Sequence, residues 1–414
     1  MSSTFSLILV AVGAYLAAHV AFGWLAKRYL IVSGAEYLLL GILLGPQVTG
    51  LISPSVFSGF APFMTLALGW IGTLVGAQFY LPNLVRYRAP VFRIAFFAAI
   101  ATLVAVTGIM TFVFGWLFDM APVRALVPAL VLGAIATASS PAGIGLVAQR
   151  VGTAAIVRQL QMTTAIDALV AITTFGLLLS IDHPAPVGTV RPPTPTEWAV
   201  ISVGIGVVGG TLFHLFLGEE RDIDRLFISL AGAIILASGA AAYMRLSPLL
   251  PAMLIGAILI NTSGNRQEIA QVLVSVERPI YFVLLIFAGA AWQPSERAWI
   301  VPVVVYLVLR IGAKTGAAYV AAWSNQALPA LGPLWGRALW GQGGLAIAIA
   351  LNYLQHEFSV LASVIFTAAI VSVLLTDVMS ARVAESVVQS ARKRLGIQIP
   401  NAYAAAPPAG PEEG

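Results

Sequence analysis

The sequence predicts an all-α polytopic membrane protein with about thirteen transmembrane helices. Hydrophobic residues make up 59% of its 414 residues and charged residues only 9%, which is too little charge to cover the surface of a soluble globule of this length. Apolar runs long enough to cross a bilayer follow one another along the chain, and a short glycine pattern recurs in its two halves. Together these observations indicate an integral membrane protein built from two repeats.

Pro, Gly and charged residues divide the chain into the expected helices, each near the roughly 20 residues that a bilayer requires. The expected limits are 4–26, 30–46, 60–80, 90–117, 123–148, 158–181, 196–217, 226–244, 247–262, 279–293, 298–322, 333–355 and 359–381. We interpret the first run as a spanning helix and not as a cleaved leader, because no basic residue precedes it. One transmembrane domain is therefore expected over residues 1–394, followed by a disordered cytoplasmic tail over 395–414.

Loop charges predict how these helices are oriented. If the N-terminus lies outside, sixteen Lys and Arg residues fall in the inside loops and the tail. The outside loops then hold four, namely Arg124, Arg191, Arg245 and Arg297. This positive charge on the inside indicates an odd number of spans and a cytoplasmic C-terminus. The net charge of +5 is thus a topology signal, and nucleic acid is not expected as a partner.

A weak internal repeat relates the two halves. Residues 40–45 read Leu-Gly-Ile-Leu-Leu-Gly, and residues 255–260 read Ile-Gly-Ala-Ile-Leu-Ile, each in the second helix of a set of six. Because seven spans separate these helices, the halves run through the membrane in opposite directions. We expect repeat one over 4–181, a linker helix over 196–217 and repeat two over 226–382.

The fifth helix of each half carries a break. Residues 137–145 read Thr-Ala-Ser-Ser-Pro-Ala-Gly-Ile-Gly, and residues 340–344 read Trp-Gly-Gln-Gly-Gly. Proline and clustered glycine interrupt a helix and free backbone groups that are tolerated only inside the protein or beside water. Breaks at matching places in two inverted halves point to the binding site of a transporter.

Asp167 is the most informative single residue, because no other charged residue lies between Arg158 and Asp182. A carboxylate at the bilayer centre costs roughly 2.5–3.5 kcal/mol or more, so it is usually retained for transport, proton relay or charge pairing. Nearby hydroxyls offer oxygen ligands for a monovalent cation, and a proton competes with the cation for the same carboxylate. These hydroxyls belong to Thr137, Ser139, Ser140, Thr163 and Thr164. The alternative is an aspartate that pairs with an Arg or Lys to hold two helices together.

Two basic residues, Arg310 and Lys314, share one face of the helix expected over 298–322. Inside a bilayer they need partners, either Asp167, the carbonyl ends of the broken helices or water at the membrane edge. We favour a structural role, in which they neutralise the C-terminal ends of the broken helices, over direct proton carrying. Glu36 either lines an ion entrance or caps its own helix. Glu277 and Arg278 are expected as an interfacial pair at a helix start, and Asp377 is expected to be solvated near the cytoplasmic end of the last helix.

Other chemistries have little support in the sequence. The absence of cysteine excludes disulfides, thiolate metal sites and cysteine nucleophiles, and the four histidines are scattered without ligand spacing. We therefore expect neither enzymatic activity nor a cofactor. The glycines of the linker helix, Gly204, Gly206, Gly209 and Gly210, form a small-residue pattern of the kind found at helix interfaces, including dimer interfaces.

These passages resemble the monovalent cation:proton antiporter superfamily, and more closely its bacterial Kef-type and sodium/proton antiporter branch. The matching passages, in order, are 35–46 with its Glu and Gly-Ile-Leu-Leu-Gly-Pro run, the broken segment 132–142, Asp167, the basic helix at 310–316 and the segment 340–350. The resemblance covers about residues 5–382. It implies the sodium/proton antiporter fold, with inverted repeats, two crossing helices, and a core domain that moves as an elevator against a dimerisation domain.

By this resemblance, Asp167 carries the cation and the proton, and Thr137 with Ser139 or Ser140 helps to bind the cation. Lys314, with Arg310 and Gln342, is expected to stabilise the crossing helices. The resemblance implies exchange of Na⁺ or K⁺ for H⁺ by a homodimer in the lipid of the bacterial inner membrane. Ile166 stands where the family has a second polar or acidic residue, which favours either electroneutral exchange or an altered choice of ion. Two alternatives remain, a proton-independent cation channel and an organic-anion symporter in which Arg310 and Lys314 bind the substrate.

Overall fold

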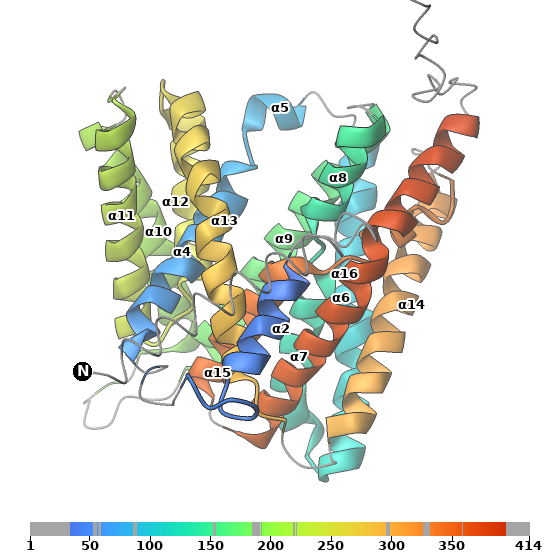
Figure 1. The fold of residues 1–414 in the computed structure, drawn as a ribbon. Helices are drawn as coiled ribbons and strands as arrows, with labels where there is room; N and C mark the ends of the chain where they lie inside the picture. Colours follow the sequence, from blue (N-terminus) through green and yellow to red (C-terminus); the bar gives the residue numbers. More distant parts are fainter. Residues whose placement is uncertain are drawn as a thin grey trace, which may run out of the picture.

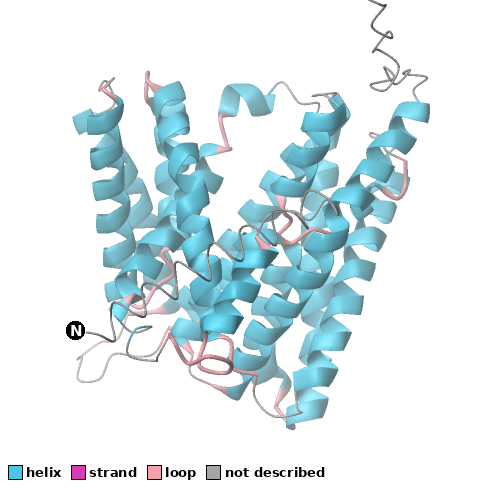
Figure 2. Cartoon of the chain, viewed as in Figure 1, coloured by secondary structure: helices cyan, strands magenta, loops and turns pink. Residues whose placement is uncertain are grey.

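The computed structural model describes residues 34–394 apart from 53–55, 57–58, 86–88, 152–154, 184–190, 192, 218–219, 221, 295–298, 326–331 and 358. The helix expected over 4–26 and the tail expected over 395–414 therefore lie outside the described residues. Every regular element in the described ranges is a helix (Figure 2). This agrees with the all-α class expected from the sequence.

The helices follow the expected order along the chain (Figure 1). They are α2 (Ala35–Leu44), α4 (Ala61–Ala77), α5 (Leu81–Val85), α6 (Ala89–Phe118), α7 (Pro122–Thr137), α8 (Pro141–Val151), α9 (Ala155–Ile181), α10 (Pro195–Leu217), α11 (Ile223–Tyr243), α12 (Leu249–Thr262), α13 (Arg266–Ala291), α14 (Ile300–Asn325), the short 3₁₀ helix η2 (Trp335–Leu339), α15 (Gly343–His356) and α16 (Val360–Arg394). In the described residues, eight helical stretches are long and apolar enough to cross a membrane. The chain is thus a multi-pass membrane protein.

Some helix limits differ from those expected. Helix α13 begins at Arg266, thirteen residues before the expected start at 279, so Glu277 and Arg278 lie in mid-helix and not at a helix start. The expectation was wrong because it treated Pro279 as a boundary, whereas the helix continues through it. Prolines are tolerated inside membrane helices when neighbouring groups satisfy the freed backbone. Helix α16 likewise continues to Arg394, well beyond the expected limit at 381.

Two matching helix contacts relate the halves. In one, a Cβ built on Gly41 of α2 would collide with the carbonyl oxygen of Ile286 in α13, and Gly289 of α13 meets α2 equally closely. In the other, a Cβ on Gly256 of α12 would collide with the backbone of α4, and Gly76 of α4 meets α12. The second helix of each half thus packs on the third helix of the other half through glycine, and this symmetry agrees with an inverted repeat.

The helices form two groups (Figure 1). Helices α4, α10, α11 and α12 pack together in one group, with α13 beside them. Helices α6, α7, α9, α14 and α16 form the other group. Three of the four α10 glycines, at positions 206, 209 and 210, pack on α12 of the same chain, whereas a Cβ on Gly204 would meet no other atom within 4 Å. The three packed glycines therefore serve contacts within the chain and give no support to a dimer face.

Candidate functional site

The two breaks expected from the sequence cross each other inside the protein. Helix α7 ends at Thr137 and α8 begins at Pro141, while η2 ends at Leu339 and α15 begins at Gly343. Between them, the backbone N–H of Ser140 donates to the carbonyl oxygen of Gly341 at 2.8 Å. Gly343 has a φ of 63°, and a Cβ there would lie 2.8 Å from the Ser140 side chain. Only glycine combines this left-handed backbone with so close an approach.

Lys314 and Arg310 of α14 bind the carbonyl groups that the breaks release. Lys314 Nζ donates to the carbonyl oxygen of Thr137 at 2.7 Å. Arg310 donates to Ala138 at 3.2 Å and to Trp340 at 2.6 Å, so one guanidinium spans both crossing segments. Helix C-termini carry partial negative charge and unpaired carbonyls, which these two cations neutralise.

The Asp167 carboxylate lies against Lys314, and its two oxygens differ. Oδ2 accepts from Lys314 Nζ at 2.6 Å and from the Ser139 hydroxyl at 2.6 Å. Oδ1 is buried and has no hydrogen-bond partner within the described residues. Both ionic side chains are almost completely buried, Asp167 at 1% exposed and Lys314 at 3%. Buried polar atoms are seldom left unpaired. A bound cation could be the missing partner of Oδ1, because carboxylate oxygens are suitable ligands for hard cations.

The five hydroxyl residues expected around Asp167 are all buried near the breaks or on α9. They are Thr137, Ser139, Ser140, Thr163 and Thr164. Ser139 donates to Asp167, whereas each threonine hydroxyl donates to a carbonyl three or four residues earlier in its own helix. The Ser140 hydroxyl oxygen accepts from the backbone N–H of Ala142. The structure thus brings Ser139 onto the carboxylate and shows no such contact for the other four.

Two further predicted site residues lie in different places, Gln342 in the crossing region and Glu36 at the start of α2. The Gln342 side chain lies in the crossing region, where Nε2 donates to the carbonyl oxygen of Ile135 and to Tyr306 Oη, each at 2.8 Å. Glu36 Oε2 accepts from the backbone N–H of Gly34 at 3.0 Å, at the start of α2. This contact matches the capping alternative for Glu36. The entrance alternative stays a prediction.

Asp377 of α16 is a site residue that the sequence analysis misplaced. It is 5% exposed and not solvated as expected. Its Oδ1 accepts from the backbone N–H of Gln342 at 2.8 Å and of Gly343 at 3.2 Å. The expectation failed because it placed the helix end at 381, whereas α16 continues to Arg394. The repeat offered a usable signal, since Asp377 lies in the sixth helix of its half as Asp167 does.

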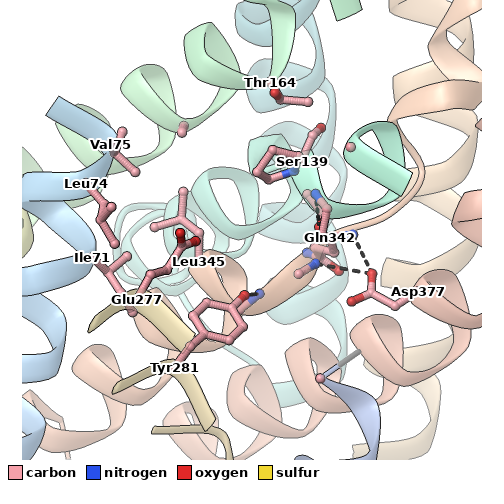
Figure 3. Close-up of a pocket in the computed structure, with 18 of the residues that line it drawn as sticks. Ile71, Leu74, Val75, Ser139, Thr164, Glu277, Tyr281, Gln342, Leu345 and Asp377 are labelled. Carbon is pink, nitrogen blue, oxygen red and sulfur yellow. Dashed lines mark hydrogen bonds between the residues drawn. The ribbon is translucent and has the colours of Figure 1, made fainter. Parts of the chain in front are cut away.

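A cavity of about 720 Å³ lies between the two helix groups, beside the crossing segments. Figure 3 shows Glu277 and Tyr281 of α13 on one side, and Ser139, Gln342 and Asp377 on the other. Ser139, the hydroxyl donor to Asp167, is one of its lining residues. Glu277, which we expected at the membrane interface, thus lines this cavity with its carboxylate. The cavity therefore reaches a direct neighbour of the buried carboxylate.

Comparison with known proteins gives similarity of fold. No family model matches the sequence, and no curated protein sequence matches it. The structure resembles that of the sodium proton antiporter MjNhaP1 from Methanocaldococcus jannaschii at pH 8, with a TM-score of 0.67, 17% identity, and coverage of 92% of this chain and 99% of that chain. An electron-microscopy structure of the same antiporter gives a TM-score of 0.63 and 16% identity, covering 95% and 99% of the two chains. The sodium/proton antiporter fold expected from the sequence is confirmed.

Proposed function

We propose that this protein is a secondary transporter that exchanges protons for a monovalent cation across the membrane, with Asp167 as the shared binding group. The observation that carries the proposal is the state of this buried carboxylate. One oxygen is held by Lys314 and Ser139, and the other has no hydrogen-bond partner within the described residues. The fold that the chain shares with a sodium proton antiporter supports the same activity.

The pair formed by Asp167 and Lys314 provides a way for cation and proton to compete. An ammonium 2.6 Å from the carboxylate is favoured in its charged form by that contact. A cation bound at Oδ1 neutralises the carboxylate and weakens the hold of Asp167 on the proton that it shares with Lys314. A proton then leaves the pair when the cation binds, and the cation leaves when a proton returns. Burial strengthens this competition because water screens the charges poorly there.

We infer that the exchange is one cation for one proton and therefore electroneutral. Replacing one proton of the pair by one monovalent cation leaves its total charge unchanged. The neighbouring position does not supply a second carboxylate, because Ile166 is apolar and 0% exposed. The cation in this proposal is Na⁺ or K⁺, both of which oxygen ligands suit.

In the proposed cycle, the group that contains the crossing segments moves against the group of α4, α10, α11 and α12. The position of the cavity supports this elevator movement, because residues of both groups line it and because it reaches Ser139, which donates to Asp167. From the family resemblance and the loop charges we also propose a homodimer in a bacterial inner membrane, with the N-terminus outside and the C-terminus in the cytoplasm.

The organic-anion alternative has less support. Arg310 and Lys314 are 0% and 3% exposed, and both donate to backbone carbonyls of the crossing segments. Cations already engaged in this way are poorly placed to bind a substrate anion. A cation channel differs in needing no stoichiometric proton movement, so flux measurements separate it from an exchanger.

The central experiment uses purified protein in liposomes with an imposed pH gradient and a fluorescent pH indicator. Addition of Na⁺, K⁺ or Li⁺ to wild-type protein is expected to drive proton movement, and Asp167→Asn is expected to abolish it. Asp224→Asn is the matched control, because Asp224 is an exposed carboxylate in the first turn of α11. Cation-dependent proton movement that persists in Asp167→Asn would remove the proposal, and cation flux without proton movement would favour the channel.

The stoichiometry is tested at the balance point of the two gradients. One-for-one exchange stops when the inside-to-outside ratios of cation and proton are equal, at any membrane potential. A balance point that moves with the potential would contradict electroneutral exchange while leaving the exchange activity itself intact.

A further inference from the structure

Asp377 binds the start of the second crossing helix through the backbone. Its Oδ1 accepts two N–H groups at the N-terminal end of α15, those of Gln342 and Gly343. Tyr281 Oη accepts the next N–H, that of Gly344. A helix N-terminus carries partial positive charge, so a carboxylate that accepts its N–H groups is stabilised in its negative form. Asp377 thus has the geometry of a fixed helix cap supplied by another helix.

A continuous path of contacts leads from this cap to Asp167. The Gln342 backbone that Asp377 holds follows directly after Gly341, whose carbonyl oxygen accepts from Ser140 N–H at 2.8 Å. Ser140 follows directly after Ser139, whose hydroxyl donates to Asp167 at 2.6 Å. The path between the two aspartates therefore consists of three hydrogen-bonded contacts joined by two short backbone segments, 341–342 and 139–140. A displacement of residues 341–343 would be passed to the oxygen ligand nearest the proposed cation site.

We propose that Asp377 is a positioning residue that sets the cation affinity at Asp167 by holding the second crossing segment in place, and that it carries neither the cation nor the proton. This inference rests on the proposed function and extends it to the other repeat. The cap contribution depends on an acceptor oxygen at position 377, whereas transport of a proton would depend on a titratable carboxyl there. Substitution can separate these two requirements.

The transport test compares Asp377→Ala with Asp377→Asn, since asparagine keeps a carbonyl oxygen that can accept both N–H groups. Asp377→Ala is expected to raise the apparent KM for the cation about tenfold with a smaller effect on the maximal rate, because charged hydrogen bonds are lost. Asp377→Asn is expected to restore most of the affinity and to leave the pH profile unchanged. Thr376→Val is the control, because this neighbour on α16 bonds only within its own helix in the described structure. Loss of exchange in Asp377→Asn equal to that in Asp167→Asn would overturn the inference.

Double substitution tests the path itself. If Asp377 acts through Ser139, the KM of the Ser139→Ala, Asp377→Ala double variant is expected to rise by less than the product of the single effects. A rise in KM equal to the product of the single effects would show that the two residues act separately, which contradicts the positioning role.

A measurement without transport separates this inference from the proposed function. Hydrogen–deuterium exchange of residues 139–143 and 340–344 is expected to speed up in Asp377→Ala and to stay near the wild-type rate in Asp377→Asn. Unchanged protection in Asp377→Ala would overturn the positioning role even in a protein that exchanges ions normally. A wild-type protein without cation-dependent proton movement, in turn, would refute the proposed function while the hydrogen–deuterium result still decided whether Asp377 holds the segment.

Discussion

Asp167 and Asp377 lie at matching places in the two halves, each buried in the sixth helix and next to a break, yet their partners differ in kind. Asp167 contacts side chains that can move or lose a proton, those of Lys314 and Ser139. Asp377 contacts backbone N–H groups at a helix terminus, which can do neither. The partners of a buried carboxylate, more than its burial, therefore distinguish a group suited to ion exchange from one suited to holding a helix in place.

The halves are alike where only packing matters. Gly41 and Gly256 both bring their helices against the backbone of a helix from the other half. The difference is concentrated at α14, which supplies Arg310 and Lys314 to the crossing region. The two halves therefore share the same helix packing, and the unmatched residues Arg310 and Lys314 make the surroundings of Asp167 chemically different from those of Asp377.

The largest expected effect concerns Lys314. Lys314→Gln leaves the Asp167 carboxylate buried without its cationic partner, and breaking a buried ion pair typically costs about 3–5 kcal/mol. Thermal unfolding in detergent is expected to show this loss, and the Asp167→Asn, Lys314→Gln double variant is expected to recover much of it without regaining ion exchange. A single variant as stable as wild type would show that the pair is not coupled as described.

A smaller loss is expected at Arg310, the residue that joins both crossing segments. Arg310→Lys keeps the positive charge but replaces the two separate guanidinium nitrogens, one on Trp340 and one on Ala138, with a single nitrogen on a shorter side chain, so we expect one of the two contacts to be lost. Loss of one hydrogen bond involving a charged group is expected to cost about 1.5–3 kcal/mol. The unfolding midpoint checks this, with Lys393→Arg in the last turn of α16 as a conservative comparison.

Gly41 and Gly256 test whether the matching helix contacts of the two halves contribute equally to stability. Gly41→Ala and Gly256→Ala each place a methyl group against a backbone carbonyl, and overpacking of this kind costs about 1–3 kcal/mol. We expect the two losses to be similar in unfolding measurements. Losses that differ several-fold would mean that the two helix contacts are not equivalent.

The smallest expected effect has the opposite sign. Gly239 lies inside α11, where a Cβ would meet no other atom within 4 Å. Gly239→Ala is expected to stabilise the protein by about 0.5–1 kcal/mol, because alanine loses less conformational freedom in a helix. The same unfolding assay measures it, and a destabilisation would show that this face of α11 is packed.

Much of the fold could be predicted from the sequence because membrane helices are long apolar runs and because Pro and Gly mark the breaks. Asp167 could be found as an isolated charge, and the Arg310 and Lys314 pair by its helical spacing. The sequence did not reveal that Pro279 lies inside a helix or that Asp377 caps α15, since both depend on which neighbours satisfy the backbone. The α10 glycines were ambiguous for a similar reason, because spacing alone does not say which helix they contact.

The hydrogen bond between Ser140 and Gly341 also bears on how the protein is made. These residues are 201 positions apart, from the difference of their numbers, so the first break obtains this backbone partner only after most of the chain has been synthesised. Until then, the first half must remain in the bilayer without the carbonyl partner of the Ser140 N–H. Long-range contacts of this kind form late and slowly. The candidate site therefore forms as one of the last steps of biogenesis, when the second half inserts beside the first.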